Sequence, residues 1–226
     1  VTGVQTCALP IWTNNTKASI ELSKYAEEVG ADMVLIITPY YNKTSQKGLY
    51  AHFSAINDAI NIPIMLYNVP SRTGMNITPL MLDKLADLNN VVAIKEASGD
   101  LSQVAKMAEL CGDRIAIYSG NDDQIVPILS LGGAGVVSVL ANILPEETHN
   151  ICEKYFLGEV IESRNLQLKY LSLANSLFIE TNPIPVKTAM NLMNFNCGPL
   201  RLPLCEMEDS NLVILEENLK ANGLIK

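Results

Sequence analysis

The sequence predicts a parallel α/β fold and, within that class, a (β/α)8 TIM barrel rather than an open doubly wound sheet. Apolar runs suited to buried parallel strands alternate with stretches whose apolar residues recur at helical spacing. Periodicity alone leaves both architectures open. However, no Gly-x-Gly-x-x-Gly turn follows the first strand, and polar residues end four different predicted strands, which is typical of barrel active sites.

Each predicted strand is a nearly continuous apolar run. Such runs are expected where helices cover both faces of a parallel sheet, or where strands line the interior of a barrel. The predicted strands are Val34–Tyr41, Ile64–Pro70, Val91–Ala97, Ile115–Gly120 and Gly135–Asn142.

Helical spacing fills the intervals between these runs. One stripe precedes Gly30, a C-cap signal, and Thr78-Pro79 opens another helix as N-cap and first residue. Pro145 begins a further helix. The three apolar stripes consist of Leu22, Tyr25, Ala26 and Val29; of Leu49, His52, Phe53, Ile56 and Ile60; and of Leu101, Val104, Ala105 and Ala108.

Beyond residue 158 the chain is predicted to be all helical. Pro183 and Pro185 open one late helix, and Glu208–Asn222 forms another. We therefore predict a partial (β/α)8 barrel over residues 13–157 and a C-terminal helical region over residues 158–226.

Bulk composition excludes several classes of protein. The net charge of −8 argues against a nucleic-acid partner, because phosphate binding requires clustered Lys and Arg. No run of about eighteen apolar residues predicts a membrane span. The first dozen residues lack the basic region of a signal peptide.

Cysteine and histidine usage narrows the chemistry further. Five widely spaced cysteines, odd in number, fit free thiols in a reducing compartment, so we predict a cytoplasmic protein. The two histidines, His52 and His149, lie far apart and are predicted to be structural. A His-rich metal site and a Ser-His-Asp triad are both disfavoured.

Lys95 is the sharpest candidate for catalysis. It lies late in an apolar strand, and an unperturbed lysine is neutral in only about one molecule per few thousand at pH 7. Desolvation at the mouth of a barrel lowers the pKa of a lysine and yields an amine that can attack a ketone. A strand-end lysine can also reach solvent or pair with Glu96 or Asp100, and position alone favours that structural interpretation.

Two tyrosines and an arginine are expected near Lys95. Tyr67 ends the preceding strand, where its phenol could pass protons, and Tyr41 follows one strand earlier. Buried tyrosines with a satisfied hydroxyl are commoner. Arg72, in the loop after Tyr67, could hold a carboxylate in bidentate fashion, although most loop arginines are surface residues.

The glycine-rich segment 132–135 precedes its strand rather than following it. It therefore lies on the face opposite a barrel active site. We interpret it as a tight turn between a helix and a strand, which disfavours a sugar-phosphate substrate.

Several long strings in the sequence occur together in one known family. They are TPYYNK (38–43), LYNVPSRTG (66–74), IKEASGDL (94–101), YSGND (118–122), GGAGVVSVLAN (132–142) and NPIPVK (182–187). With these strings, the chain resembles the dihydrodipicolinate synthase family from about Asn14 to the C-terminus.

This resemblance implies a lyase of the class I aldolase type. It would condense pyruvate with L-aspartate 4-semialdehyde to 4-hydroxy-tetrahydrodipicolinate, in lysine and diaminopimelate biosynthesis, with no metal or organic cofactor. The enzyme would be a cytoplasmic homotetramer built as a dimer of dimers.

The resemblance also implies a role for each candidate residue. Lys95 would form the Schiff base with pyruvate, and Tyr67 would donate and accept protons above it. Tyr41 would reach across a dimer interface in a proton relay. Arg72 would bind the carboxylate of the second substrate. Main-chain groups of Gly120 and Val137 would surround the pyruvate.

The sequence departs from the family at its beginning. Three further β-strand units and a Gly-Thr-Thr-Gly-Glu segment of the family have no counterpart, and residues 1–12 match nothing in it. We therefore expect a foreign or artefactual leader over residues 1–12, an N-terminally truncated barrel, and a chain that by itself is poorly folded or inactive.

A second departure concerns a lysine-effector site. Asn14 and Tyr40 match positions of the inhibitory site in regulated relatives, whereas Ala18 stands where such relatives carry a glutamate. The resemblance thus implies a possible, altered effector site.

Two other functions stay open. An N-acetylneuraminate lyase or sugar-acid aldolase would keep the Schiff base and change the acceptor, but Arg72 favours a small acceptor with its own carboxylate. An inactive fragment, or a non-enzymatic binding or oligomerisation relative, would form no Schiff base.

Overall fold

The computed structural model describes residues 7–226, and the chain divides into two compact units. Unit 1 holds the described residues up to Gly120 together with Ser130–Gly135. Unit 2 holds Asn121–Leu129 and Val136–Lys226. The predicted boundary between residues 157 and 158 stays a prediction.

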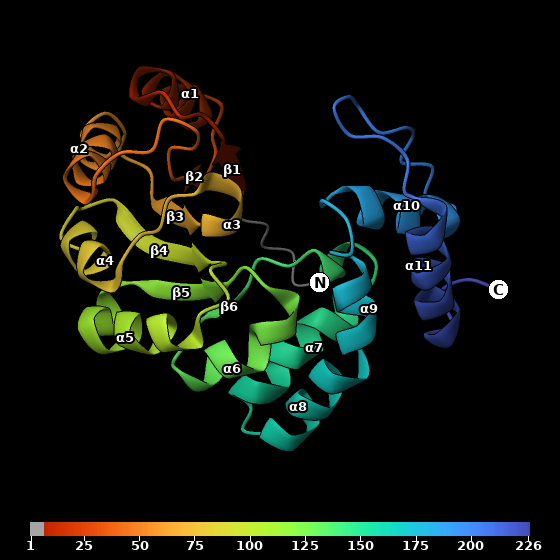
Figure 1. The fold of residues 1–226 in the computed structure, drawn as a ribbon. Coiled ribbons are helices and arrows are strands. Elements are labelled where there is room, and N and C mark those ends of the chain that lie inside the picture. The colour runs from red at the N-terminus through yellow and green to blue at the C-terminus, as the bar shows by residue number, and fades with distance from the viewer. Residues whose placement is uncertain (1–6) are drawn as a thin grey trace. The chain divides into compact units, whose positions relative to one another are not determined.

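Unit 1 is built from alternating strands and helices (Figure 1). Its strands are β1 (Ala8–Ile11), β2 (Met33–Ile37), β3 (Ile64–Asn68), β4 (Val91–Glu96) and β5 (Ala116–Ser119). Its helices are α1 (Thr16–Glu28), α2 (Gln46–Asn57), the short α3 (Pro70–Thr73), α4 (Pro79–Leu85) and α5 (Leu101–Cys111), followed by the 3-10 turn η1 (Gly112–Arg114).

The sheet follows chain order without a crossover. Its order is β1-β2-β3-β4-β5-β6, and the pairs from β1 to β5 are parallel. An open doubly wound sheet instead reverses its order at a switch point. The four longer helices lie on one side of the sheet, and α1 contacts α2, α2 contacts α4, and α4 contacts α5 (Figure 1). This arrangement is that of a TIM-barrel-like α/β fold, as the sequence predicts.

The core of unit 1 lies between the sheet and these helices. Neighbouring strand residues such as Leu35 and Ile36, or Ala93 and Ile94, are all buried, so both faces of the sheet are covered. The second predicted stripe is buried along its length, from Leu49 on α2 to Ile60 just after it. The predicted cap at Thr78 is confirmed, because its side chain accepts a hydrogen bond from the backbone N–H of Met81.

Two predictions about unit 1 are wrong in detail. The predicted stripe on α1 does not pack into the core as expected, because three of its members are exposed, namely Leu22, Tyr25 and Val29. The residues of α1 that are buried are Ser19, Ser23 and Ala26. The small serines allow close packing, and in the described residues their buried hydroxyl oxygens have no hydrogen-bond partner.

The second error is that no strand is predicted before Val34. Ala8–Ile11 nevertheless forms β1 and pairs in parallel with β2, although Pro10 cannot donate to the ladder. Residues 1–6 of the predicted leader lie outside the described residues.

Two short elements lie at the unit boundary, α6 (Ile125–Ser130) and β6 (Gly135–Val136). The fifth predicted strand, Gly135–Asn142, is thus only two residues long. The chain turns because the carboxylate of Asp122 accepts hydrogen bonds from the backbone N–H groups of Val139 and Leu140, both at 3.0 Å. These two bonds replace ladder bonds and start the 3-10 turn η3 (Leu140–Asn142).

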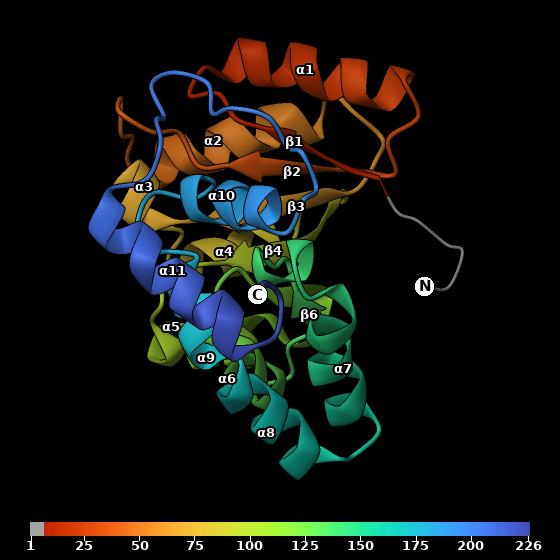
Figure 2. The same cartoon turned by 90° about the vertical axis from the view of Figure 1, so that its right-hand side faces the viewer.

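The rest of unit 2 is helical, as predicted. After the 3-10 turn η2 (Asp122–Gln124) and η3 come α7 (Pro145–Phe156), α8 (Val160–Lys169), α9 (Leu171–Ser176), α10 (Ile184–Leu192) and α11 (Asp209–Ala221). The helices α10 and α11 contact each other (Figure 2). A cluster of buried apolar residues joins them to α9 and η3, including Leu173, Leu177, Ala189, Leu215 and Leu219.

Candidate active site

The candidate site lies where β3 and β4 end, and strand pairing builds it. Tyr67 and Lys95 are register partners in neighbouring parallel strands, and Tyr118 of β5 is the partner of Lys95 on its other side. Side chains of register partners leave the sheet on the same face. The sequence prediction that Tyr67 and Lys95 stand side by side is therefore met by the structure.

Lys95 and Tyr67 are in direct contact. The Nζ of Lys95 lies 4.5 Å from the ring centroid of Tyr67, within the range of a cation–π interaction. Burial raises the pKa of the Tyr67 phenol, and the nearby guanidinium of Arg72 acts in the opposite direction. The phenol is therefore protonated at neutral pH. A nitrogen nucleophile and a proton donor lie against each other at one strand end.

Because Gly120 has no side chain, it leaves space for the side chain of Lys95. A Cβ at this position would lie 2.7 Å from the Cβ of Ala97 and 3.1 Å from the Cε of Lys95. Both distances are too short for an undisturbed contact, so any larger residue would displace the lysine stem or the strand beneath it. The backbone N–H of Gly120 donates to the carbonyl of Glu96 at 2.7 Å, which ties the end of β5 to β4.

Arg72 is exposed on α3, the short turn after β3. Thr73 anchors this turn: its hydroxyl lies 3.0 Å from the hydroxyl of the buried Thr38 and 3.0 Å from the carbonyl of Met75. Arg72 acts on the Tyr67 phenol electrostatically. The structure thus brings Arg72 to the same end of the sheet as Lys95 and Tyr67.

Tyr41 does not join this group within the chain. It follows β2, is 87% exposed and has a φ of 64°. A left-handed backbone at a non-glycine residue costs roughly 1–2 kcal/mol. The neighbouring Tyr40 is connected to the other predicted effector residue, because the Nδ2 of Asn14 donates to the carbonyl of Tyr40 at 3.1 Å.

Val137 belongs to unit 2 and is half-buried directly after β6. The segment that follows it is held by Asp122, as described above.

The two histidines lie on helices. His149 is exposed on α7 beside Glu153, and His52 is buried in α2 with its Nδ1 2.9 Å from the hydroxyl of Thr16.

Sequence reasoning missed a buried polar cluster behind the site. Asn68 and Glu96, the residues after Tyr67 and Lys95, are also register partners, and the Nδ2 of Asn68 donates to the Oε2 of Glu96 at 2.8 Å. A signal was present in the sequence. Two polar residues that each end an apolar strand are costly to bury separately, and this cost favours a pair between them.

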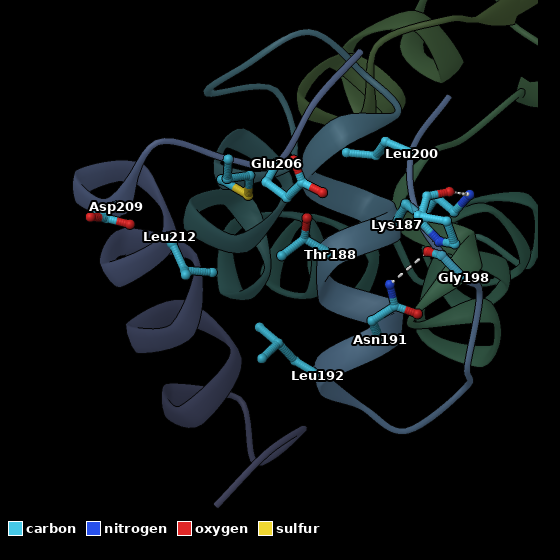
Figure 3. A pocket seen from close by; sticks show the side chains of 11 residues that line it. Lys187, Thr188, Asn191, Leu192, Gly198, Leu200, Glu206, Asp209 and Leu212 are labelled. Carbon is cyan, nitrogen blue, oxygen red and sulfur yellow. Dashed lines mark hydrogen bonds between the residues drawn. The ribbon is translucent and has the colours of Figure 1, made fainter. Parts of the chain in front are cut away.

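A separate cavity of about 470 Å³ lies in unit 2 between α10, the start of α11 and the loop before it (Figure 3). Two of its polar side chains are engaged with the protein: the Nζ of Lys187 donates to the carbonyl of Pro199 at 2.6 Å, and the Nδ2 of Asn191 donates to the carbonyl of Gly198 at 3.1 Å. These bonds fold the loop onto α10. The cavity offers no paired nucleophile and proton donor like that at the end of β3 and β4.

Within residues 7–226, no three His, Cys, Asp or Glu side chains gather in a way that could hold a metal ion. None of the helices described has the length and apolar character needed to cross a membrane.

Comparison with known proteins points to a single family. Residues 11–222 match the Dihydrodipicolinate synthetase family. The chain is 66% identical over 214 residues to 4-hydroxy-tetrahydrodipicolinate synthase 1 of Clostridium acetobutylicum, an alignment that covers 95% of this chain and 73% of that protein.

Solved structures agree. The crystal structure of dihydrodipicolinate synthase from Thermotoga maritima has a TM-score of 0.94 and 42% identity, covering 96% of this chain and 75% of that one. The chloride-inhibited dihydrodipicolinate synthase from Acinetobacter baumannii, complexed with pyruvate, has a TM-score of 0.90 and 38% identity, covering 97% and 74%. With this match across nearly all of its residues, the chain belongs to the dihydrodipicolinate synthetase family.

Proposed function

We propose that this chain is a 4-hydroxy-tetrahydrodipicolinate synthase, a lyase that condenses pyruvate with L-aspartate 4-semialdehyde. The observation that carries the proposal is the contact between Lys95 and Tyr67 at the ends of β3 and β4. The names of the relatives support it, since proteins 55–66% identical to this chain are called 4-hydroxy-tetrahydrodipicolinate synthase.

In the first step, the neutral amine of Lys95 adds to the ketone carbon of pyruvate. The carbonyl oxygen leaves as water and a Schiff base forms. The phenol of Tyr67 is protonated at neutral pH, and burial raises its pKa further; it supplies a proton to the departing oxygen and takes one back later. Each imine formed releases one water molecule, and no atom changes its oxidation state, so the step needs no oxidant or reductant.

The remaining candidates bind and orient the substrates. Arg72 holds the carboxylate of the semialdehyde, for which a guanidinium is suited in charge and geometry. Main-chain groups of Gly120 and Val137 surround the pyruvate. The relative crystallised with pyruvate supports pyruvate as the first substrate.

Tyr41 acts in a second copy of the chain. Its exposure and left-handed backbone leave its ring free of the site in its own chain, which supports a proton relay across a dimer interface. We accordingly propose a cytoplasmic homotetramer, arranged as a dimer of dimers. We also propose that the six-stranded sheet is part of a (β/α)8 barrel, since its strands follow chain order.

Lysine is proposed as an effector at Asn14 and Tyr40. The hydrogen bond between the Asn14 side chain and the Tyr40 carbonyl supports this proposal, because it joins the start of α1 to the loop after β2. Ala18 contributes no carboxylate there, so binding is expected to be weaker than in a site with a glutamate.

The same Schiff base would serve an N-acetylneuraminate lyase or a sugar-acid aldolase. The names of the relatives do not favour this alternative. Neither does Arg72, whose charge suits a small acceptor that carries its own carboxylate.

Borohydride trapping tests the proposal. The folded chain is incubated with pyruvate, reduced with borohydride, digested and analysed by mass spectrometry. We expect a reduced pyruvate adduct on the peptide that carries Lys95 and none in Lys95→Arg, because a guanidinium does not form an imine at neutral pH. A folded chain that gives no adduct, or one that is modified equally after Lys95→Arg, overturns the proposal.

A further inference from the structure

Directly behind Tyr67 and Lys95, the next residue of each strand forms a second pair. Asn68 and Glu96 are register partners, as Tyr67 and Lys95 are. Because successive side chains of a strand point to opposite faces, Asn68 and Glu96 lie on the far face of the sheet from the reactive pair. Both are buried, with exposed fractions of 0% and 1%.

The carboxylate of Glu96 connects β3 to β4 and to the turn that follows. Its Oε2 accepts from the Nδ2 of Asn68 at 2.8 Å, and its Oε1 accepts from the backbone N–H of Ser98 at 2.7 Å. Both oxygens are therefore engaged with different segments. Any relative movement of the two strand ends along the sheet would break one of these bonds.

Asn68 extends the connection to the loop that carries Arg72. Its Oδ1 accepts from the backbone N–H of Ile77 at 2.9 Å, and its Nδ2 also contacts the Oδ1 of Asn76 at 2.9 Å. The amide of Asn76 contacts the Oε1 of Gln103 on α5 at 2.7 Å. The loops after β3 and β4 are thus tied together beneath the reactive pair.

Stability alone does not explain why this polar cluster is buried here. Burial raises the pKa of Glu96, and the hydrogen bonds from Ser98, Asn68 and Gln103 offset the effect only in part. Replacing buried charged or polar groups by well-packed apolar residues is often neutral or stabilising. What apolar residues cannot supply is a directional link with one allowed register.

We propose that Glu96 is a positioning residue of the reaction: acting through Asn68, it holds the ring of Tyr67 against the amine of Lys95 and fixes the loop that carries Arg72. Glu96 touches no substrate. The inference rests on the proposed Schiff-base function and goes beyond it by assigning the geometry of the reactive pair to a side chain on the opposite face of the sheet.

The test measures the rate of borohydride trapping against pyruvate concentration. In Glu96→Gln, one acceptor oxygen becomes an N–H2 group that faces a donor, so the bond to Asn68 or to Ser98 is lost. We expect the limiting rate to fall about ten- to a hundredfold, as a misplacement near 1 Å can produce, with little change in the half-saturating concentration. A merely structural role would lower the melting temperature and leave the limiting rate of the folded protein unchanged.

A double variant provides a rescue. In Glu96→Gln with Asn68→Asp, the new amide at position 96 donates to the new carboxylate at position 68, which still accepts from Ile77. The amides of Asn76 and Gln103, which bond to each other, turn over together so that Asn76 donates to the new carboxylate. The link between the strands is restored with its direction reversed. We expect the double variant to recover most of the lost rate, and a double variant as slow as Glu96→Gln contradicts the positioning role.

Asn90→Ala is the matched control, because Asn90 precedes β4 at its opposite end and its side chain also makes partly buried hydrogen bonds. It should melt earlier without a change in limiting rate. If Glu96→Gln does not fold, Glu96→Asp, which keeps the charge but retracts it, is expected to show the same fall in rate, and an unchanged rate contradicts the inference.

The two proposals fail separately. No adduct in the unsubstituted folded chain refutes the proposed function. An adduct in that chain, formed at the same limiting rate in folded Glu96→Gln, refutes only the role of Glu96.

Discussion

Amide side chains form hydrogen bonds at both ends of β3 and β4, yet the two ends differ in what surrounds them. At the amino end, Asn90 donates to the carbonyl of Asn57 at 3.0 Å and to the carbonyl of Ile60 at 2.8 Å. At the carboxyl end, Asn68 bonds to Glu96, and the other face of the same strand ends carries Tyr67 and Lys95. The ends lie about 20 Å apart, at ~3.3 Å per strand residue.

The difference separates two uses of a polar cluster at a strand end. The amino-end amide caps main-chain carbonyls that would otherwise be unsatisfied, and it is linked to no reactive group. The carboxyl-end cluster connects two side chains to each other and stands back to back with the candidate chemistry. Substitutions at the first end should change stability alone, whereas substitutions at the second should change rate.

The largest effect is expected from Tyr67→Phe. The ring stays under the amine of Lys95, and only the hydroxyl is lost, so the variant isolates proton transfer. General acid–base groups contribute roughly 10²–10⁴-fold, and we expect a fall of that order in the limiting rate of pyruvate trapping, with an unchanged melting temperature. Tyr118→Phe, on the other side of Lys95, is the control and should stay within a few-fold of the unsubstituted chain. Equal effects of the two variants would remove Tyr67 from the mechanism.

Gly120→Ala should have the next largest effect. Its new Cβ would press on the Cβ of Ala97 at 2.7 Å and on the Cε of Lys95 at 3.1 Å. Displacing the amine by about 1 Å is expected to slow trapping by roughly 10²-fold. Gly30→Ala is the control, because Gly30 has a φ of 83° and open space around it. It should lower stability by about 1 kcal/mol without slowing the reaction, and a Gly120→Ala chain with full activity would show that the lysine stem tolerates the shift.

Asn90→Ala should change stability and nothing else. It leaves the carbonyls of Asn57 and Ile60 without their donor, and the loss of these two partly buried hydrogen bonds costs about 1–3 kcal/mol. Urea unfolding measures this loss. A fall in trapping rate beyond about twofold would contradict this expectation, because it would mean that the two strand ends are coupled although ~20 Å separates them.

How much of the two strand ends can be predicted from the sequence depends on whether a contact follows from where the strands end or from the turns after them. Tyr67 and Lys95 could be placed side by side because each ends an apolar run, and the ends of parallel strands meet at one edge of a sheet. Asn68 and Glu96 end the same two runs, so a signal for their bond was present as well, whereas the bonds from the backbone N–H groups of Ile77 and Ser98 depend on turns that no periodic pattern specifies.

The prediction for α1 fails for a different reason. Apolar periodicity places Leu22, Tyr25 and Val29 inside, whereas the structure buries Ser19, Ser23 and Ala26. Packing close to a neighbouring helix selects small residues, so size overrides hydrophobicity there. The anchoring role of Asp122 was missed as well, because two backbone N–H groups seventeen and eighteen residues away form its site.

The smallest effect concerns pH, and it decides how a pH–rate profile of the carboxyl end is interpreted. Burial lowers the pKa of His52 from 6.5 to about 4, and protonation would put N–H groups on both ring nitrogens although Nε2 has no partner among the described residues. The unfolded chain therefore binds the proton more readily, so stability is lost as pH falls from about 6.5 toward 4. Between pH 7 and pH 5 the loss should be about 2 kcal/mol.

Replacing the imidazole separates this effect from catalysis. His52→Asn should remove most of that loss between pH 7 and pH 5 in urea unfolding, even if the variant is less stable at pH 7. His149→Asn, at an exposed histidine, should leave the loss intact. Because His52 is on α2 and bonds to Thr16 rather than to either strand-end cluster, a fall in trapping rate below pH 6 that persists in folded His52→Asn would come from the reactive pair itself. A fall that disappears in this variant would reflect unfolding.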